Sequence, residues 1–215
     1  MIPSMNVKDA IRSRRSVKCF DPEHRLNQEE LHELIEAGML APTSFNMQNF
    51  HFVFCTDKEV QAKLRQASWD QAQVEEASVT IVLAGNLEAY KNTDRYLRNA
   101  PEEIRQMFGN MIPGFYGSNP ALNRDEACRS VSFAGQNMML RAKEMGLDSC
   151  PMIGFDPTKV SEILGLPEDH PPLLMITIGK ALKPARPRMG LLSIEEVVSV
   201  NAFGNHPISG EILPE

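Results

Sequence analysis

The run "SVTIVLAG" at positions 78–85 is almost continuously apolar. A strand with one wet face alternates apolar and polar residues, whereas a strand that is covered on both faces is apolar throughout. The run therefore predicts a strand buried on both of its faces, with packed layers on either side. Residues 51–56 ("HFVFCT") and 173–180 ("LLMITIGK") predict two further strands.

Helical patterns cover more of the chain than strand patterns do. The clearest one starts at Asn27, which forms a capping-box pattern with Glu30, and Pro42 ends it. Asn6 and Asp57 can cap two more helices. The predicted helices span residues 6–14, 27–40, 57–67, 120–143 and 157–166.

Three segments are predicted without helix or strand. Residues 86–119 are polar and contain the Pro/Gly-rich stretch "NMIPGFYGSNP", residues 148–156 ("DSCPMIGFD") read as a compact loop, and the chain after residue 180 is extended and basic. No repeat or shift in composition divides the sequence, and helices outnumber strands. We therefore expect one α+β domain over residues 1–215, with a core at about 6–198 and a tail at 199–215.

Charge and cysteine content narrow the class of protein. The net charge of −6 argues against a nucleic-acid binder, which needs a basic face to neutralise phosphates. Four widely spaced cysteines are typical of a reduced, intracellular protein. The sequence shows neither a signal peptide nor an apolar run long enough to span a membrane. These observations predict a cytoplasmic protein that binds neither membranes nor nucleic acid.

Several common catalytic and binding motifs are absent. The sequence contains no G-x-G-x-x-G after a strand, no phosphate-binding loop, no H-E-x-x-H and no G-x-S-x-G. Its five histidines are scattered, and no cysteine or histidine pair has the spacing of metal ligands. We expect no metal site.

Four segments carry residues that suit ligand binding. They are "SRRSVKCF" (13–20), "APTSFNMQNFHF" (41–52), "SCPMIGFD" (149–156) and "KPARPR" (183–188). Arginine binds phosphate with two parallel hydrogen bonds, amides can read the edge of a heterocycle, and glycine allows backbone to approach a flat ligand. Each segment also has an ordinary structural explanation: basic residues at a helix C-terminus, polar residues in turns, and a solvated tail.

In this order, the four segments resemble the flavin-dependent nitroreductases. Members of that family open with R-x-S-x-[RK]-x-[FY], continue with A-P-S-x-x-N-x-Q-P-[WF]-x-F, and later carry a P-x-x-G-F loop and a basic pair. The similarity extends from about residue 7 to residue 198. It implies a nitroreductase-like α+β fold with a central mixed sheet surrounded by helices. It also implies an intertwined homodimer that binds FMN at each of two subunit interfaces.

The resemblance assigns roles to the residues of these segments. One set would hold the phosphate, the ribityl chain and the pyrimidine edge of FMN, a second would reach FMN from the other subunit, and a third would lie against the isoalloxazine ring. In the third set, the backbone N–H of Ile153 or Gly154 would point to flavin N5. The sets are Arg14, Arg15, Ser16 and Lys18 with Arg186 and Arg188; Pro42, Thr43, Ser44, Asn46 and Gln48; and Pro151, Met152, Ile153 and Gly154.

The sequence departs from the family pattern in "SWDQAQVEEAS". Asp70 stands where asparagine is common, and Gln73 stands where lysine is frequent. An acidic Asp70 near the N1–O2 edge of the flavin would disfavour the anionic reduced cofactor, whereas Gln73 can still donate a hydrogen bond to the pyrimidine. In the segment 86–119, Phe108, Phe115 and Tyr116 are candidates for a lid over the substrate face, although an ordinary surface excursion would fit the segment as well.

The implied activity is that of an FMN-dependent NAD(P)H oxidoreductase. Hydride would pass from NADH or NADPH to the flavin, and then, in a ping-pong sequence, to a nitroaromatic, a quinone or a similar planar acceptor. The flavin carries this chemistry, so no side chain is expected to act as a catalytic acid or base. Two alternatives stay open: a related FMN enzyme that catalyses dehydrogenation, dehalogenation or flavin cleavage, and a flavin-binding regulatory protein without turnover.

Overall fold

A computed structural model describes residues 5–210 of the chain. These residues form two compact units, of which the first ends at Pro184 and the second begins at Ala185. The first unit contains the whole β-sheet and all but one of the helices that the structure describes. The prediction of a single domain with a tail at 199–215 stays a prediction, and the last five residues of that tail lie outside the described residues.

The sheet of the first unit has the strand order β1-β2-β4-β3. Every neighbouring pair of these strands is antiparallel. The expectation of a mixed sheet is therefore wrong for the described residues, where the parallel pairing is limited to an isolated bridge between Ser16 and Ser149. That bridge involves an extended segment too short to count as a strand. The strands are β1 (Phe50–Cys55), β2 (Val79–Gly85), β3 (Asp148–Met152) and β4 (Pro172–Gly179).

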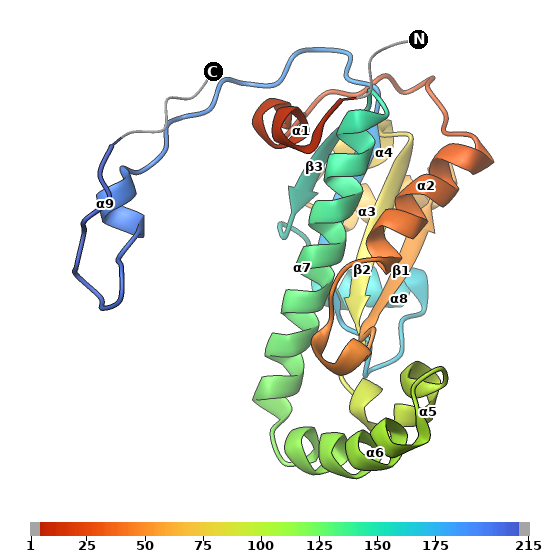
Figure 1. Cartoon of the computed structure of the whole chain (residues 1–215). Helices are drawn as coiled ribbons and strands as arrows, with labels where there is room; N and C mark the ends of the chain where they lie inside the picture. Colours follow the sequence, from red (N-terminus) through yellow and green to blue (C-terminus); the bar gives the residue numbers. More distant parts are fainter. Residues whose placement is uncertain (1–4, 211–215) are drawn as a thin grey trace. The chain divides into compact units, whose positions relative to one another are not determined.

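The apolar run at 78–85 forms β2, and all seven residues of this strand are buried. Because side chains alternate across a strand, Ile81 and Leu83 enter one hydrophobic cluster and Val82 enters another on the opposite face. The first cluster lies beneath α2 (Gln28–Met39) and the long helix α7 (Pro120–Glu144), and the second beneath α3 (Lys58–Ala67), α4 (Gln73–Glu76) and α8 (Pro157–Leu164). Two covered faces explain the continuous apolar sequence (Figure 1).

The long helix α7 approaches the sheet closely at Gly135. A Cβ atom at this position would come within 2.9 Å of the side chains of Leu174 and Ile176. The predicted start of this helix at Pro120 is confirmed, as is the capping box of Asn27 and Glu30 at α2. The cap of the short helix α1 (Val7–Ser13) is also confirmed, since the Asn6 side chain accepts a hydrogen bond from the backbone of Asp9.

Two predicted loops contain regular structure. Residues 86–119 form the short helix α5 (Thr93–Leu97) and the longer helix α6 (Glu102–Gly117), even though Pro113 lies inside α6. Burial of Ile112 and Tyr116 in a third hydrophobic cluster outweighs the cost of proline in a helix. Residues 148–152 form β3 because all five of them pair with β4, from Gly179 back to Met175. Two short 3-10 turns occupy Ser44–Asn46 and Ala89–Lys91.

The second unit holds the helix α9 (Ile194–Val197). This helix has a capping box of Ser193 and Glu196. The backbone N–H of Ile194 donates to the carbonyl of Gly210 over 3.1 Å, which closes the segment into a loop. Phe203 is fully exposed.

Candidate cofactor site

The first predicted segment leaves α1 and runs beside β3. The backbone N–H of Val17 donates to the carbonyl of Ser149 over 3.1 Å, next to the bridge between Ser16 and Ser149. Val17 and Phe20 are buried, whereas Ser16 and Lys18 are exposed. The extended backbone thus presents the hydroxyl of Ser16 and the ammonium group of Lys18 on the same, open side of the segment.

A side chain that the sequence did not single out, Gln71, connects three predicted site residues. Its Oε1 accepts hydrogen bonds from Lys18 Nζ over 3.5 Å and from Gln73 Nε2 over 2.9 Å. Its Nε2 donates to the carbonyl oxygen of Gly154 over 2.9 Å. Residues from three distant parts of the sequence therefore meet at one amide group. The sequence feature that could have identified Gln71 is its position between Asp70 and Gln73, which were both candidate site residues.

The loop that follows β3 offers backbone donors. Ile153 is 78% exposed, and within the described residues neither its N–H nor that of Gly154 has an intramolecular acceptor. The N–H of Phe155 donates to the carbonyl of Ile153 over 3.0 Å, which tightens the loop. Met152 is buried below it, and its Sδ accepts a hydrogen bond from Gln73. Pro151 belongs to β3 and is partly exposed.

A tryptophan that the sequence analysis overlooked lies against this loop. Trp69 is 71% exposed, yet a Cβ atom on Gly154 would come within 2.9 Å of its Cζ3 atom. Trp69 and Asp70 have left-handed backbone conformations, with φ of 52° and 55°. The Asp70 carboxylate lies 3.8 Å from Arg65 Nε and is largely exposed. Only the fact that the chain has a single tryptophan could have drawn attention to this residue.

The basic residues of the first segment have different surroundings. Arg14 caps the C-terminus of α1, and Arg15 Nη1 donates to the backbone carbonyls of Arg12 and Arg14. Arg15 therefore fits the structural explanation of a cation at a helix C-terminus. Arg186 and Arg188 belong to the second unit, so their predicted role at the phosphate stays a prediction.

The second predicted segment, residues 42–48, lies at the other end of the first unit. Ser44 Oγ and the hydroxyl of Tyr116 share a hydrogen bond of 2.9 Å, and Asn46 Nδ2 donates to the carbonyl of Tyr96 over 2.9 Å. The side chain of Thr43 accepts from the backbone N–H of Gln48. Pro42 is exposed. In Figure 1 this segment lies near α6, whereas α1 lies at the opposite end of α7.

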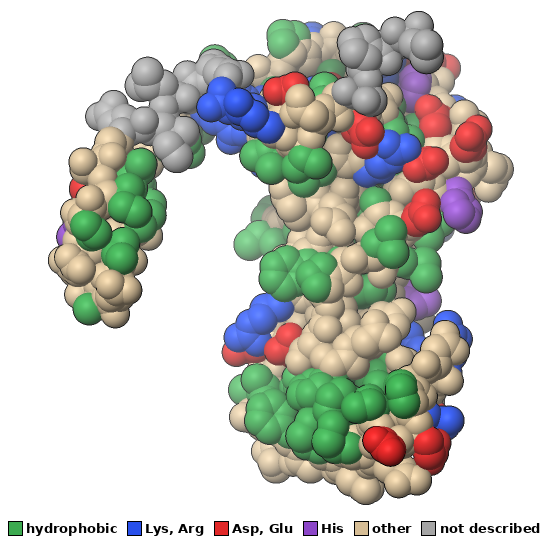
Figure 2. All heavy atoms as spheres, in the orientation of Figure 1, with side chains coloured by type: hydrophobic (Ala, Val, Ile, Leu, Met, Phe, Trp, Pro, Cys, Tyr) green, Lys and Arg blue, Asp and Glu red, His purple; other side chains and the backbone are tan. Residues whose placement is uncertain are grey.

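The three substrate candidates differ in exposure. Phe108 and Tyr116 pack edge-on around Phe45, with ring centroids 5.2 and 6.4 Å from it, and Tyr116 is buried. Phe115 is exposed and extends a stripe that includes Met107 and Met111. Figure 2 shows hydrophobic side chains gathered over α6 at the lower end of the view. The structure therefore leaves Phe115 open to a ligand and uses Tyr116 for packing.

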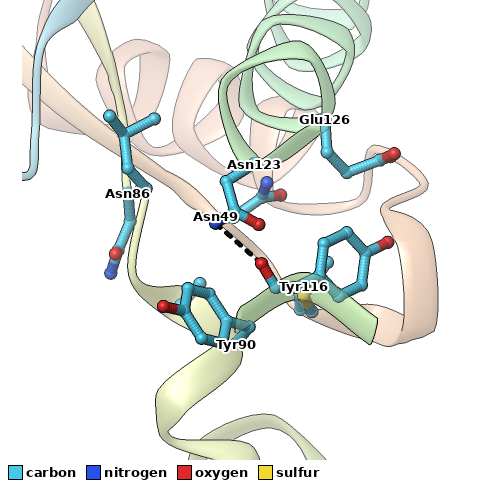
Figure 3. A pocket seen from close by; sticks show the side chains of 9 residues that line it. Asn49, Asn86, Tyr90, Tyr116, Asn123 and Glu126 are labelled. Carbon is cyan, nitrogen blue, oxygen red and sulfur yellow. Dashed lines mark hydrogen bonds between the residues drawn. The ribbon is translucent and has the colours of Figure 1, made fainter. Parts of the chain in front are cut away.

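A small cavity lies behind the 42–48 segment (Figure 3). It has a volume of about 10 Å³, which is room for one water molecule. Asn49 and Asn123 line it, and each has a buried side-chain oxygen without a hydrogen-bond donor. Asn123 Nδ2 donates to the carbonyl of Tyr116. Burial raises the pKa of the nearby Tyr96 phenol to about 12, with a smaller contribution from Tyr116, so Tyr96 stays protonated.

The described residues include no cluster of three metal-ligating side chains and no helix that could cross a membrane. Burial raises the pKa of the Cys55 thiol to about 11, which leaves this thiol protonated and unreactive at neutral pH. The amide of Gln71, where Lys18, Gln73 and Gly154 meet, is the candidate for ligand chemistry.

The sequence matches the family model of the nitroreductases over residues 11–180. Protein DrgA of Synechocystis sp. is 48% identical over 182 residues, which cover 84% of this chain and 87% of DrgA. The Bacillus subtilis protein named "Putative NAD(P)H nitroreductase YodC" is 33% identical over 186 residues, which cover 84% of this chain and 92% of YodC.

A solved structure has the same fold. A protein from Exiguobacterium sibiricum, crystallised in complex with FMN, superposes with a TM-score of 0.83 and 26% identity, over 91% of this chain and 97% of that chain. Fold and family model thus agree with the resemblance that the four segments carry. The chain belongs to the nitroreductase family.

Proposed function

We propose that the protein is an FMN-dependent NAD(P)H oxidoreductase of the nitroreductase type. The observation that carries this proposal is the convergence of Lys18, Gln73 and Gly154 on the amide of Gln71. Lys18 and Gly154 come from two of the segments that resemble flavin-binding segments of the family, and Gln73 stands at a position where the family frequently has lysine. The name of the relative YodC and the FMN complex of the structural neighbour support the same cofactor and electron donors.

The donors of the site fit a flavin. Within the described residues Lys18 Nζ makes one hydrogen bond, to Gln71, and two of its three N–H donors are left for an anionic or carbonyl group. The N–H groups of Ile153 and Gly154 are open to a heterocyclic nitrogen. A flavin offers a planar ring with acceptors along one edge and a phosphate at its far end, and this donor set matches that ring edge.

FMN, when bound, would accept hydride from NADH or NADPH and pass it to a planar acceptor such as a nitroaromatic or a quinone. The protein's contribution is placement and electrostatics. Lys18 would hold the pyrimidine edge and Ser16 the ribityl chain, and the positive charge of Lys18 favours electron-rich states of the ring. The exposed Ile153 and Trp69 would border the space above Gly154. Donor and acceptor would use the same open face in turn.

We also propose that the functional form is a homodimer. Asn46 and Gln48 belong to the segment 42–48, which lies near α6, whereas α1, which precedes Lys18, lies at the opposite end of α7 (Figure 1). A second copy of the chain, related by a twofold axis, can bring its residues 42–48 to the Lys18 end of the first. Two large apolar side chains at the C-terminal end of α2, Met39 and its C-cap Leu40, are exposed and would be covered in such a dimer. Free cysteines and nicotinamide donors support a cytoplasmic location.

The visible absorption spectrum, recorded after FMN addition and desalting, tests the cofactor. We expect a retained flavin band that bleaches on anaerobic mixing with NADPH or NADH. A protein that stays colourless would contradict the proposal, and a flavin that never bleaches would leave a flavin-binding protein without reductase activity. Product analysis with nitroaromatics and quinones then separates a reductase from a related FMN enzyme with another reaction.

The variant Arg14→Ala tests the orientation of the cofactor. Because Arg14 is expected to bind the phosphate, the variant should weaken FMN by about tenfold or more and riboflavin hardly at all. Equal weakening of both ligands would remove Arg14 from the phosphate site. Arg25→Ala is the matched control, since Arg25 is exposed and bonds to the carbonyls of Pro22 and His24.

A further inference from the structure

We propose that Gln71 is a positioning residue that sets the affinity and the reduction potential of the bound flavin. This inference rests on the proposed function, since it concerns the same cofactor. Gln71 itself need not touch the cofactor. Its role is to fix Lys18 and the Gly154 loop relative to each other, so that the ammonium group and the backbone donors of the loop form one preorganised surface.

The hydrogen bonds of Gln71 determine how its amide is oriented. The oxygen faces two donors, Lys18 Nζ and Gln73 Nε2, and the nitrogen faces an acceptor, the carbonyl of Gly154. Exchange of the two amide atoms would place N–H groups against donors and an oxygen against a carbonyl. Only one orientation is therefore satisfied. A single glutamine thus couples a cation to a neutral loop, which neither a carboxylate nor an apolar side chain can do.

The backbone on both sides holds Gln71 in place. Its N–H donates to the carbonyl of Ser68, and its carbonyl accepts from the N–H of Val74 at the start of α4. The two preceding residues, Trp69 and Asp70, are in the left-handed conformation, which is unfavourable for residues other than glycine. Strained backbone persists where the surroundings require it, and here it places Gln71 under Gly154.

The Gly154 loop depends on the same contact. With its carbonyl engaged by Gln71 and the ring of Trp69 against its α-carbon, Gly154 is held on one side, while the N–H groups of Ile153 and Gly154 are left for a ligand. Without Gln71, this carbonyl would lose its donor and the loop could turn away from Lys18. The predicted effect is on the arrangement of the donors rather than on a contact with the flavin.

Two substitutions separate the charge effect from the positioning effect. Gln71→Leu removes all three hydrogen bonds without adding charge. Gln71→Glu keeps the shape and the acceptors for Lys18 and Gln73, but loses the N–H that reaches Gly154 and adds a negative charge beside Lys18. We expect the Kd for FMN to rise about fivefold to tenfold in Gln71→Leu. In Gln71→Glu we expect a similar rise and a lower midpoint potential, because the added charge disfavours the reduced, electron-rich ring.

The experiment compares these variants with the wild type and with Gln28→Glu, which makes the same exchange at an exposed position at the start of α2. The affinity for FMN is measured by titration, and the midpoint potential of the bound cofactor by equilibration with a reference dye. A third measurement uses the protein without FMN. Trp69 is the only tryptophan of the chain, so quenching of its fluorescence by acrylamide reports on the contact with Gly154.

The outcomes distinguish this inference from the proposed function. If the wild type binds FMN and both Gln71 variants match it in affinity and potential, the positioning role is overturned. If the wild type binds no FMN, the proposed function fails. The fluorescence of the protein without FMN then still tests whether Gln71 holds the Gly154 loop. If acrylamide quenches Gln71→Leu and the wild type equally, the positioning of the loop by Gln71 is overturned as well. The unfolding midpoint of Gln71→Leu shows whether this variant has lost its fold. If it has, the affinity and midpoint potential of Gln71→Glu, which keeps the shape of the side chain, are compared with those of the wild type instead.

Discussion

Gly154 stands at a point of the candidate site that leaves little room for a side chain. A Cβ atom there would approach Trp69 Cζ3 to 2.9 Å and Gln71 Nε2 to 3.2 Å. Because Trp69 is largely exposed, its ring can move, so we expect Gly154→Ala to lower the free energy of unfolding by only about 1 kcal/mol or less. The displaced Gln71 should nevertheless weaken FMN by about tenfold.

A double-mutant cycle measures how far the two contacts account for this loss. Trp69→Ala removes the closer of them, so the double variant Trp69→Ala/Gly154→Ala should recover part of the FMN affinity that Gly154→Ala loses, relative to Trp69→Ala alone. Titration with FMN and chemical denaturation of all four proteins give the coupling. Strictly additive losses would show that Gly154 requires glycine for a reason other than the ring of Trp69.

At the scale of helices and strands, the features that a short stretch of sequence encodes were predicted, and the features that depend on long-range pairing were missed. The predictions of the capping box of Asn27 and Glu30 and of a doubly buried strand at 78–85 are confirmed. Each of them could be made from a pattern within a few consecutive residues. β3 was predicted as a loop because it is short and its burial comes from β4, which lies far along the chain. Gln71 was missed for the same reason, since its partners Lys18 and Gly154 are 53 and 83 residues away.

The helix α6 was predicted as a loop because Pro113 argues against a helix. Since Pro113 nevertheless lies inside α6, it should lower the stability of the protein. Proline lacks the N–H that would bond to the preceding turn, so Pro113→Ala should raise the free energy of unfolding by about 1–3 kcal/mol. Pro120→Ala is the control: Pro120 begins α7, where proline is tolerated, and its replacement should change stability by no more than about 0.5 kcal/mol.

Chemical denaturation of both proline variants is the measurement. A destabilised Pro113→Ala would mean that the ring of Pro113, which is partly buried, contributes more by packing than it costs in hydrogen bonding. The same variant is informative for function. Because α6 carries Phe108, Phe115 and Tyr116, a change in turnover without a change in FMN affinity would connect this helix to the acceptor rather than to the cofactor.

At the scale of the whole molecule, the candidate residues of one chain form two separate groups. Lys18, Gln73 and Gly154 lie around Gln71, whereas Asn46 and Gln48 are tied to each other and to the α5–α6 region. In a symmetric dimer, each site would combine the first group of one chain with the second group of its partner. Neither group alone would then form a complete site, and the oligomeric state would determine whether FMN binds.

Mixed dimers test this arrangement. Lys18→Ala impairs the first group and Gln48→Ala the second, so every site in either homodimer carries one defect. When the two variants are refolded together, heterodimers have one intact site and one doubly defective site, and about a quarter of all sites should recover wild-type affinity for FMN. As a control, a mixture of Lys18→Ala with Gln73→Ala, both in the first group, should recover none. If the first mixture also fails, while sedimentation confirms that heterodimers formed, then the two groups do not share a site and residues 42–48 serve another purpose.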